Sequence, residues 1–437
     1  MSICTIGRKG VAKGPYCPVR TMDVEYEQEL LMSQLENFEF RSATAEEMDQ
    51  FRRIAGYVFA NPPQPDSPPS RLDPDWSHCA FRDGKIAAIS GTYPFLVPLN
   101  GKIADIHGVT AVGTEPEFRR MGLIRRLITD LLYRGKEQGQ VASMLLASMG
   151  AIYQRFGYGL GSRAMSYEFD PREAEFQFPI EVNGHIRRMK KEDALPAVKG
   201  IFDTYAKDRN LLALRHDVVW EDYFSDVEKD KSYCAVHFDG DDNPDGYCFY
   251  TTRWSQGREA GPPQDLTISD LAYTSMNGYR GLWQYIRSHD LVGRVYWGNV
   301  PEDDPAYGIL LEPRCLHARL TDSLWFRIID VADMLAARHY DMDGDIVIGV
   351  EGDDLCDWNN GVYALHARNG EGEVISAEGK EPDIVCSING LASLATGFTD
   401  MTWLARIGRI RINDTSKLGY GDRLFKTRYR PSLSFGF

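Results

Sequence analysis

Apolar and polar residues alternate along the N-terminal part of the chain in a way that predicts a unit of strands and helices. Residues 38–60 predict a strand and then an amphipathic helix, for which Thr44 is the expected cap. Residues 79–113 predict three strands connected by an Asp-Gly and an Asn-Gly turn. The unit therefore begins as a strand, a helix and three strands.

The same unit continues with a crossover. Apolar residues at helical spacing predict a helix over about 122–138, and the continuous apolar run at 141–148 is typical of a strand buried on both faces. A strand, a helix and a second strand in this order form a right-handed crossover between parallel strands.

The pattern repeats from about residue 180. A strand and an amphipathic helix are followed by further strands, a helix and a last strand, at 181–209, 233–254, 265–275, 278–289 and 294–300. Because the order of elements is the same in both halves, we interpret them as an internal duplication.

A third unit is predicted from about Thr321. It opens with a strand or loop and a helix, and it continues with strands that we expect to be antiparallel, at 345–351, 361–369, 372–378 and 383–388. Two short helices follow at 388–398 and 399–408. The aromatic, extended ending at 429–437 is expected to be packed rather than frayed, and the fold class is predicted to be α+β.

The stretch from Val112 to Arg125 carries the clearest candidate chemistry. Pro116 ends a strand, and Arg119, Arg120 and Gly122 precede a helix. A helix N-terminus offers unpaired N–H groups and partial positive charge, so we interpret the segment as a cradle for a pyrophosphate. The alternative is an ordinary helix start with exposed arginines. No glycine pattern of a dinucleotide or P-loop site is present.

Composition narrows the classes of partner. The 437 residues include 49 basic and 63 acidic side chains, a net charge of −14, which disfavours nucleic acid and anionic membranes as partners. The eight cysteines are scattered without a CxxC motif, so no metal site is predicted and reduced thiols in a cytoplasm are expected. The N-terminus is not a secretory signal, and residues 1–37 are expected to form a flexible extension.

Two motifs carry a resemblance to a known family. VGTEPEFRRMGLIRR looks like the acetyl-CoA signature of GNAT acetyltransferases, although Ile124 stands where the last small residue of that signature is expected. LASMGAIYQRFGYG, residues 146–159, resembles the corresponding motif of the Eis acetyltransferases, whose chains also end in Phe, as this one does at Phe437.

The resemblance implies an architecture and a function. We expect two GNAT domains at 38–179 and 180–320, the second degenerate, and a sterol-carrier-like domain at 321–437. It also implies a homo-oligomer, a hexamer, that transfers acetyl from acetyl-CoA to a small-molecule amine without a metal. The alternative is a non-catalytic protein that binds or senses acyl-CoA or a lipid.

The resemblance also assigns roles to residues. Val112, Gly113 and Thr114 would offer backbone groups to the pantetheine arm, and Ser148 and Met149 would line the thioester. The pyrophosphate would be held by Arg119, Arg120, Met121, Gly122, Leu123, Ile124 and Arg125. Tyr153 would be the general acid, with Tyr158 as a competing candidate, and the carboxylate of Phe437 would be the general base. Tyr153 as a rim tyrosine and Phe437 as a packed end are the structural alternatives.

The acceptor pocket departs from the family pattern. Gly436 replaces a glutamate, Leu146 replaces a histidine, and Asn61 lies near an expected aspartate. Trp220 aligns with an aromatic pocket position, and the alternative is a core tryptophan on an amphipathic helix. Acidic groups are what a polycationic acceptor needs, so their loss predicts a less charged amine.

Overall fold

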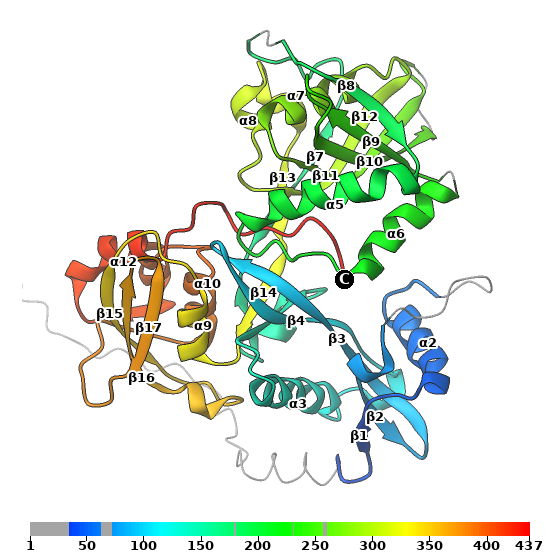
Figure 1. Cartoon of the computed structure of the whole chain (residues 1–437). Coiled ribbons are helices and arrows are strands. Elements are labelled where there is room, and N and C mark those ends of the chain that lie inside the picture. The colour runs from blue at the N-terminus through cyan, green and yellow to red at the C-terminus, as the bar shows by residue number, and fades with distance from the viewer. Residues whose placement is uncertain (1–34, 63–71, 179–180, 230, 257–259) are drawn as a thin grey trace, which may run out of the picture.

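The computed structural model describes residues 35–62, 72–178, 181–229, 231–256 and 260–437. The described chain contains three sheets covered by helices, and Figure 1 shows them as three bodies. This agrees with the predicted α+β class. The expected N-terminal extension lies, up to residue 34, outside the described residues.

The first sheet contains the predicted crossover. Its order is β1-β2-β3-β4-β5-β14-β6, with bounds Glu39–Arg41, Ser77–Arg82, Lys85–Leu99, Lys102–Thr114, Ala142–Leu146, Leu324–Ile328 and Gly159–Leu160. Helices α2 (Met48–Val58) and α3 (Leu123–Glu137) pack on it. β4 and β5 pair in parallel with α3 between them in the chain, so the predicted crossover is confirmed.

The second sheet repeats this plan. Its order is β13-β7-β12-β11-β10-β9-β8, with bounds Arg319–Asp322, Arg163–Phe169, Val292–Pro301, Gln264–Tyr273, Pro244–Trp254, Tyr233–Phe238 and His185–Met189. The helices are α5 (Lys191–Lys207), α6 (Asp217–Glu228), α7 (Met276–Arg287) and the short α8 (Ala306–Ile309). β11 and β12 pair in parallel, like β4 and β5. The predicted order of elements is present, with α6 added.

The two units exchange strands. β7 follows the first unit in the chain but pairs with β12 and β13 in the second sheet. β14 follows the second unit, and it pairs with β5 and β6 in the first sheet. The sequence placed β14 at the start of the third unit. All five of its residues are buried, as expected for an inner strand, and only its partners reveal the sheet. The predicted domain boundaries stay a prediction.

The third sheet has the order β17-β16-β15-β18-β19, with bounds Glu371–Ser376, Gly361–Arg368, Gly344–Val350, Ile384–Cys386 and Ile410–Ile412. Helices α9 (Val331–Ala337), α10 (Ile388–Ala395), α11 (Met401–Arg406) and α12 (Leu418–Leu424) accompany it. The expectation of antiparallel strands is wrong for β18, which pairs in parallel with β15. The chain after β17 crosses to the other side of β15 and returns in the same direction.

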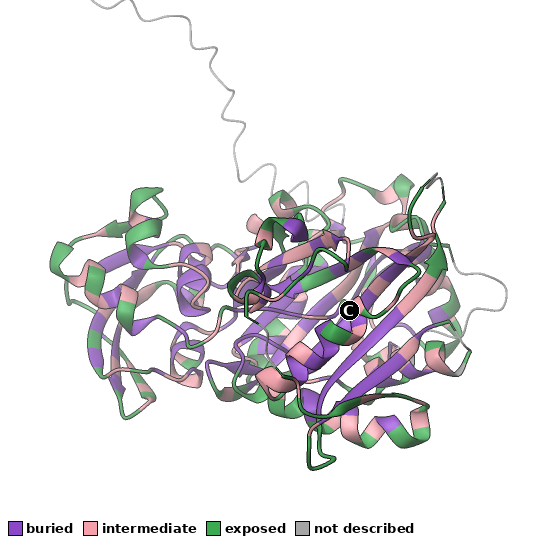
Figure 2. Cartoon of the chain, turned by 90° about the horizontal axis from the view of Figure 1, so that it is seen from above, coloured by how far each residue is buried: buried purple, intermediate pink, exposed green. Residues whose placement is uncertain are grey.

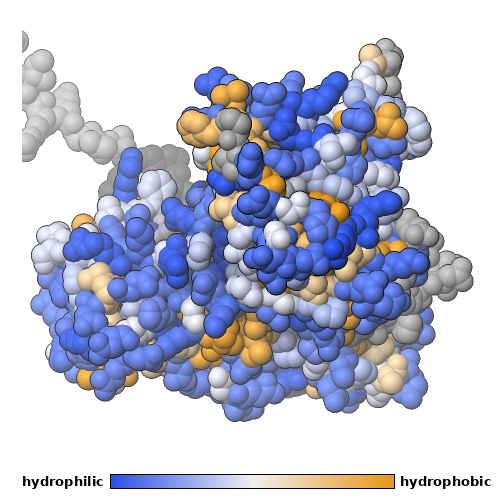
Figure 3. Space-filling view, turned by 45° about the horizontal axis from the view of Figure 1, so that its top comes forward, coloured by the Kyte–Doolittle hydropathy of each residue, from blue (hydrophilic) through white to orange (hydrophobic). Residues whose placement is uncertain are grey.

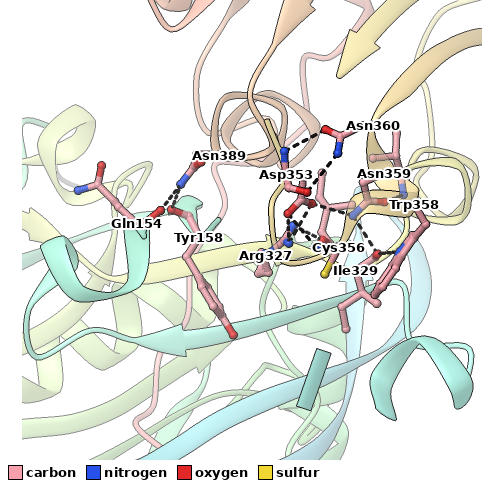
Figure 4. A network of polar contacts seen from close by, with 12 residues as sticks. Gln154, Tyr158, Arg327, Ile329, Asp353, Cys356, Trp358, Asn359, Asn360 and Asn389 are labelled. Atoms are coloured by element: carbon pink, nitrogen blue, oxygen red, sulfur yellow. Dashed lines mark hydrogen bonds and ion pairs between the residues drawn. The ribbon is translucent and has the colours of Figure 1, made fainter. Parts of the chain in front are cut away.

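A buried polar network joins the third sheet to the first (Figure 4). Arg327 of β14 donates through Nη2 to both carboxylate oxygens of Asp353, at 2.7 and 2.9 Å. Asn359 Nδ2 donates to the same carboxylate at 3.0 Å. Asn389 of α10 donates to the backbone oxygen of Tyr158 at 2.8 Å. The network fixes α10 and the loop at 353–360 against the first sheet.

Most apolar residues of the strands are buried, and the surface is mostly hydrophilic. Most residues of β2, β5, β9 and β14 are buried, and Figure 2 shows buried residues in purple along the strands. The face seen in Figure 3 is mostly hydrophilic with small apolar patches. Among the helices that the structure describes, none has both the length and the apolar content of a membrane span.

Asp353→Asn is expected to destabilise the protein by about 3–5 kcal/mol, because it leaves the buried Arg327 guanidinium without a counter-charge. The measurement is the shift of the first thermal unfolding transition. Asp217→Asn is the matched control, because its pair with Lys199 is solvent-exposed and contributes less than about 1 kcal/mol. Equal shifts in the two variants would contradict this role of Arg327.

Candidate active site

The first sheet opens between β4 and β5. Their parallel pairing ends at Val109 and Leu145, and β4 beyond this point pairs only with β3. A bulge places Ala111 (φ 51°) and Val112 opposite Ser90 alone. The predicted donor-binding residues Val112, Gly113 and Thr114 therefore have one backbone edge turned to the opening.

The start of α3 follows this opening. Arg120 (φ 66°) and Gly122 (φ 80°) turn the chain through the left-handed region before the helix begins at Leu123. The backbone N–H of Arg126 donates to Gly122 O at 3.1 Å, which is the first helical bond. The N–H groups of the three residues before Arg126 have no acceptor within the helix and suit an anionic ligand.

Side chains at this helix start divide into two groups. Arg119, Arg120 and Arg125 are exposed, and Arg119 Nε donates to Thr114 O at 3.3 Å. Leu123 is buried against alanines of β2 and β3, and Met121 and Ile124 pack at the edge of the same cluster. The apolar members can therefore offer only backbone groups to a ligand, while the arginines offer charge.

Tyr153 lies beyond the end of β5 on the short helix α4 (Gly150–Gln154). Its ring packs in one cluster with Val109 and Leu145, the last pair before the opening. Burial raises the pKa of Tyr153 to about 12, so the phenol stays protonated at neutral pH. Ser148 and Met149, just before α4, are exposed.

Tyr158, the competing candidate, is placed differently. It is fully buried, and its hydroxyl lies 2.7 Å from Ser143 Oγ. Burial also raises the pKa of Tyr158 well above its ordinary value. The hydroxyl is thus engaged within the core, and this favours Tyr153 as the proton donor.

The C-terminal tail reaches the same opening from the third domain. The Phe437 ring lies 5.0 Å from the Phe95 ring, and a Cβ on Gly108 of β4 would come within 2.9 Å of Phe437. A Cβ on Gly436 would lie 3.9 Å from Leu146 at the end of β5. In Figure 1 the red tail crosses from the third domain to the end marked C, beside α6. The last residues therefore contact both strands that border the opening.

Two buried arginines of the second unit hold the tail. Arg215 forms a bidentate ion pair with Asp270, at 2.6 and 2.7 Å, and donates to Ser434 Oγ at 3.0 Å. Arg209 pairs with Asp303 at 3.1 Å, and Asp303 also accepts from the backbone N–H of Arg430. The approach of the tail is fixed by charge-assisted bonds.

A cavity of about 320 Å³ begins at the tail and extends between the two units. Its walls come from β3, α6 with its N-cap, the residue before β9, β10, β11 and the last three residues of the chain. The lining residues are Tyr93, Phe95, His216, Val218, Val219, Tyr223, Asp226, Ser232, Thr251, Ser269, Phe435, Gly436 and Phe437. It is a candidate acceptor pocket that ends at the opening of the first sheet.

The predicted pocket residues lie in different places. Gly436 lines this cavity. Trp220 is buried, with its ring 5.4 Å from Phe202, and is not part of the lining. Asn61 is exposed just after α2. The lining residues of α6, β10 and β11 were not predicted, because no local motif marks them.

Gly108→Val is expected to displace the Phe437 ring, because the added side chain overlaps the rings of Phe95 and Phe437. The measurement is digestion with carboxypeptidase A, which removes C-terminal aromatic residues. Release of phenylalanine should become at least about tenfold faster, which corresponds to a loss of about 1.4 kcal/mol in the free energy that holds Phe437 in place. Gly200→Ala is the control, since a Cβ there meets no atom within 4 Å. Unchanged release in Gly108→Val would contradict the seating.

Comparison with known families agrees with this architecture. Residues 39–161 and 212–328 match two families that are both described as acetyltransferase (GNAT) domains, and residues 331–434 match a sterol carrier protein domain. The matches lie in the order expected from the sequence.

Relatives and solved structures cover most of the chain. An uncharacterized N-acetyltransferase of Streptomyces avermitilis is 27% identical over 365 residues, 80% of this chain and 86% of the relative. N-acetyltransferase Eis of Mycobacterium tuberculosis is 25% identical over 343 residues, 76% of this chain and 80% of the relative. The Eis1 structure from Mycobacterium abscessus, 24% identical, shares the fold with a TM-score of 0.78 and covers 92% of this chain and 100% of its own. The chain therefore contains two acetyltransferase (GNAT) domains followed by a sterol carrier protein domain, and over most of its length it is similar to N-acetyltransferases that include Eis.

Proposed function

We propose that this N-acetyltransferase transfers acetyl from acetyl-CoA directly to the primary amine of a small molecule while both are bound. The observation that carries the proposal is the meeting of the C-terminal residues with the opening between β4 and β5, at the mouth of a separate cavity. Donor and acceptor would then approach each other from two sides at this point.

The donor would enter through the opening of the first sheet. The free backbone edge of Val112, Gly113 and Thr114 would pair with the amides of the pantetheine arm, as a strand would. The pyrophosphate would lie at the start of α3, where N–H groups and Arg119, Arg120 and Arg125 gather. Ser148 and Met149 would flank the thioester.

Tyr153 would act as general acid. When the amine nitrogen forms a bond to the acetyl carbon, the carbon–sulfur bond breaks and a thiolate leaves. The Tyr153 phenol, whose pKa burial raises to about 12, holds a proton to give to that sulfur.

The carboxylate of Phe437 would act as general base. The attacking amine must lose protons, and a carboxylate at the end of the cavity can accept one directly or through a water molecule. A free α-carboxylate has a reference pKa of about 3.5, and apolar surroundings raise it. The Phe95 ring, which lies 5.0 Å from the Phe437 ring, is an apolar neighbour of the last residue.

The proposal includes a cytoplasmic location and, as the resemblance implies, a homo-oligomer, a hexamer. Large apolar side chains exposed on the second unit support an interface between copies, for example Leu311 and Leu320, which are 61% and 47% exposed.

Tyr153→Phe is expected to lower kcat about a hundredfold, because proton donation by a positioned side chain contributes roughly 10² to 10⁴ in rate. Release of free thiol from acetyl-CoA with a panel of primary amines measures it. Affinity for acetyl-CoA should stay unchanged, and the wild-type rate should not fall through this group below about pH 11, because the pKa of Tyr153 is about 12. If Tyr158→Phe loses the rate and Tyr153→Phe keeps it, Tyr158 is the acid.

Deletion of Phe437 is expected to abolish thiol release, because it withdraws the terminal carboxylate by one residue. Phe437→Leu keeps that carboxylate in place and should retain most of kcat, so the pair separates the carboxylate from the ring. Thermal unfolding of both variants controls for folding. Full activity after the deletion would refute the role of the C-terminus as base.

A further inference from the structure

Helix α6 forms one wall of the cavity between the two units, and its lining residues span most of the helix. His216, which caps the helix, and Asp226 near its end both line the cavity. Ten residues of helix separate them, which corresponds to about 15 Å at 1.5 Å per residue. Arg215, next to His216, donates to Ser434 of the tail, so an acceptor that reaches from the tail to Asp226 is elongated.

The lining beside the tail and along α6 is aromatic. The Tyr93 and Phe95 rings lie 5.9 Å apart on β3, and the Phe95 and Phe437 rings lie 5.0 Å apart. Tyr223 and Phe435 also line the cavity. Flat apolar walls of this kind favour an aromatic body between the two ends of the acceptor.

The opposite end is polar and carries a carboxylate. Asp226 is exposed there, beside the hydroxyl-bearing residues Ser232 and Thr251. Among the described residues, no Lys, Arg or His forms an ion pair with Asp226, although other carboxylates of α6 have partners, such as Glu221 with Lys191 at 2.8 Å. A carboxylate at this place can accept hydrogen bonds from a cationic group of a ligand.

On the basis of the proposed function, we propose that the acceptor is an elongated diamine whose reactive primary amine lies at Phe437, whose aromatic body fills the middle of the cavity, and whose second ammonium group binds Asp226. Asp226 is the single acidic side chain among the described lining residues. An acceptor with several more ammonium groups would leave some of them desolvated without a partner. The cavity thus selects one distal cation.

The test uses two matched probes. The first is biphenyl with an aminomethyl group at each far end, and the second is the monoamine in which one aminomethyl group is replaced by methyl. Wild-type protein is expected to acetylate the diamine with a kcat/KM about threefold to tenfold higher, because a partly exposed charge pair is screened by water. The difference should lie in KM, since Asp226 is remote from the reacting atoms.

Asp226→Asn should remove this preference by lowering kcat/KM for the diamine, while Asp226→Glu should keep the preference. Glu221→Gln is the control, because it removes a carboxylate of the same helix that pairs with Lys191 outside the cavity. Equal rates for both probes in the wild type, or equal losses for both in Asp226→Asn, would overturn the inference alone. If the wild-type protein releases no thiol with the diamine and none with the monoamine, the result would instead count against the proposed function.

Discussion

The buried pair of Arg215 and Asp270 is the interaction on which the site depends. Both side chains are removed from solvent, so further hydrogen bonds to the guanidinium offset part of its desolvation. Tyr247 and Ser434 accept from the two terminal nitrogens of Arg215, and Ser434 belongs to the tail. The Phe435 ring also lies 5.1 Å from the guanidinium carbon. The tail is therefore part of the polar core of the second unit, and this contact determines where in the structure the last residues lie.

The two duplicated units differ at the N-termini of their equivalent helices. In the first, the N-terminus of α3 is open. In the second, the equivalent helix α7 is already capped, since Ser275 Oγ accepts from Gly278 N–H at 2.9 Å and donates to Asp245 at 2.6 Å. A carboxylate of the chain itself thus stands at this helix start and opposes a second anion. The second unit instead supplies α6, β10 and β11 as walls of the cavity that we propose for the acceptor.

Local patterns explain what the sequence could predict. The crossover around α3 and the repeated order of elements follow from periodicity and turns, which neighbouring residues determine. The sheet of β14 and the direction of β18 depend on partners far along the chain, and no periodicity encodes them. The same holds for the cavity, where Tyr93, Thr251 and Phe437 meet. Trp220 illustrates the limit, because an aromatic residue on an amphipathic helix looks the same in a core and in a pocket.

The third domain determines the path of the tail before it reaches the site. Arg338 is buried and donates to the backbone oxygens of Ala395 and Phe425, which holds the end of α12 against α10. The side chain of Asn100, at the turn between β3 and β4, then accepts from the N–H of Arg428. The anchored residues Phe425 and Arg428 lie twelve and nine positions before Phe437. Little of the chain between them and the last residue therefore remains free to move. A terminal carboxylate can act in catalysis only if its position is restricted in this way. Here the domain of sterol carrier type restricts the position of the tail.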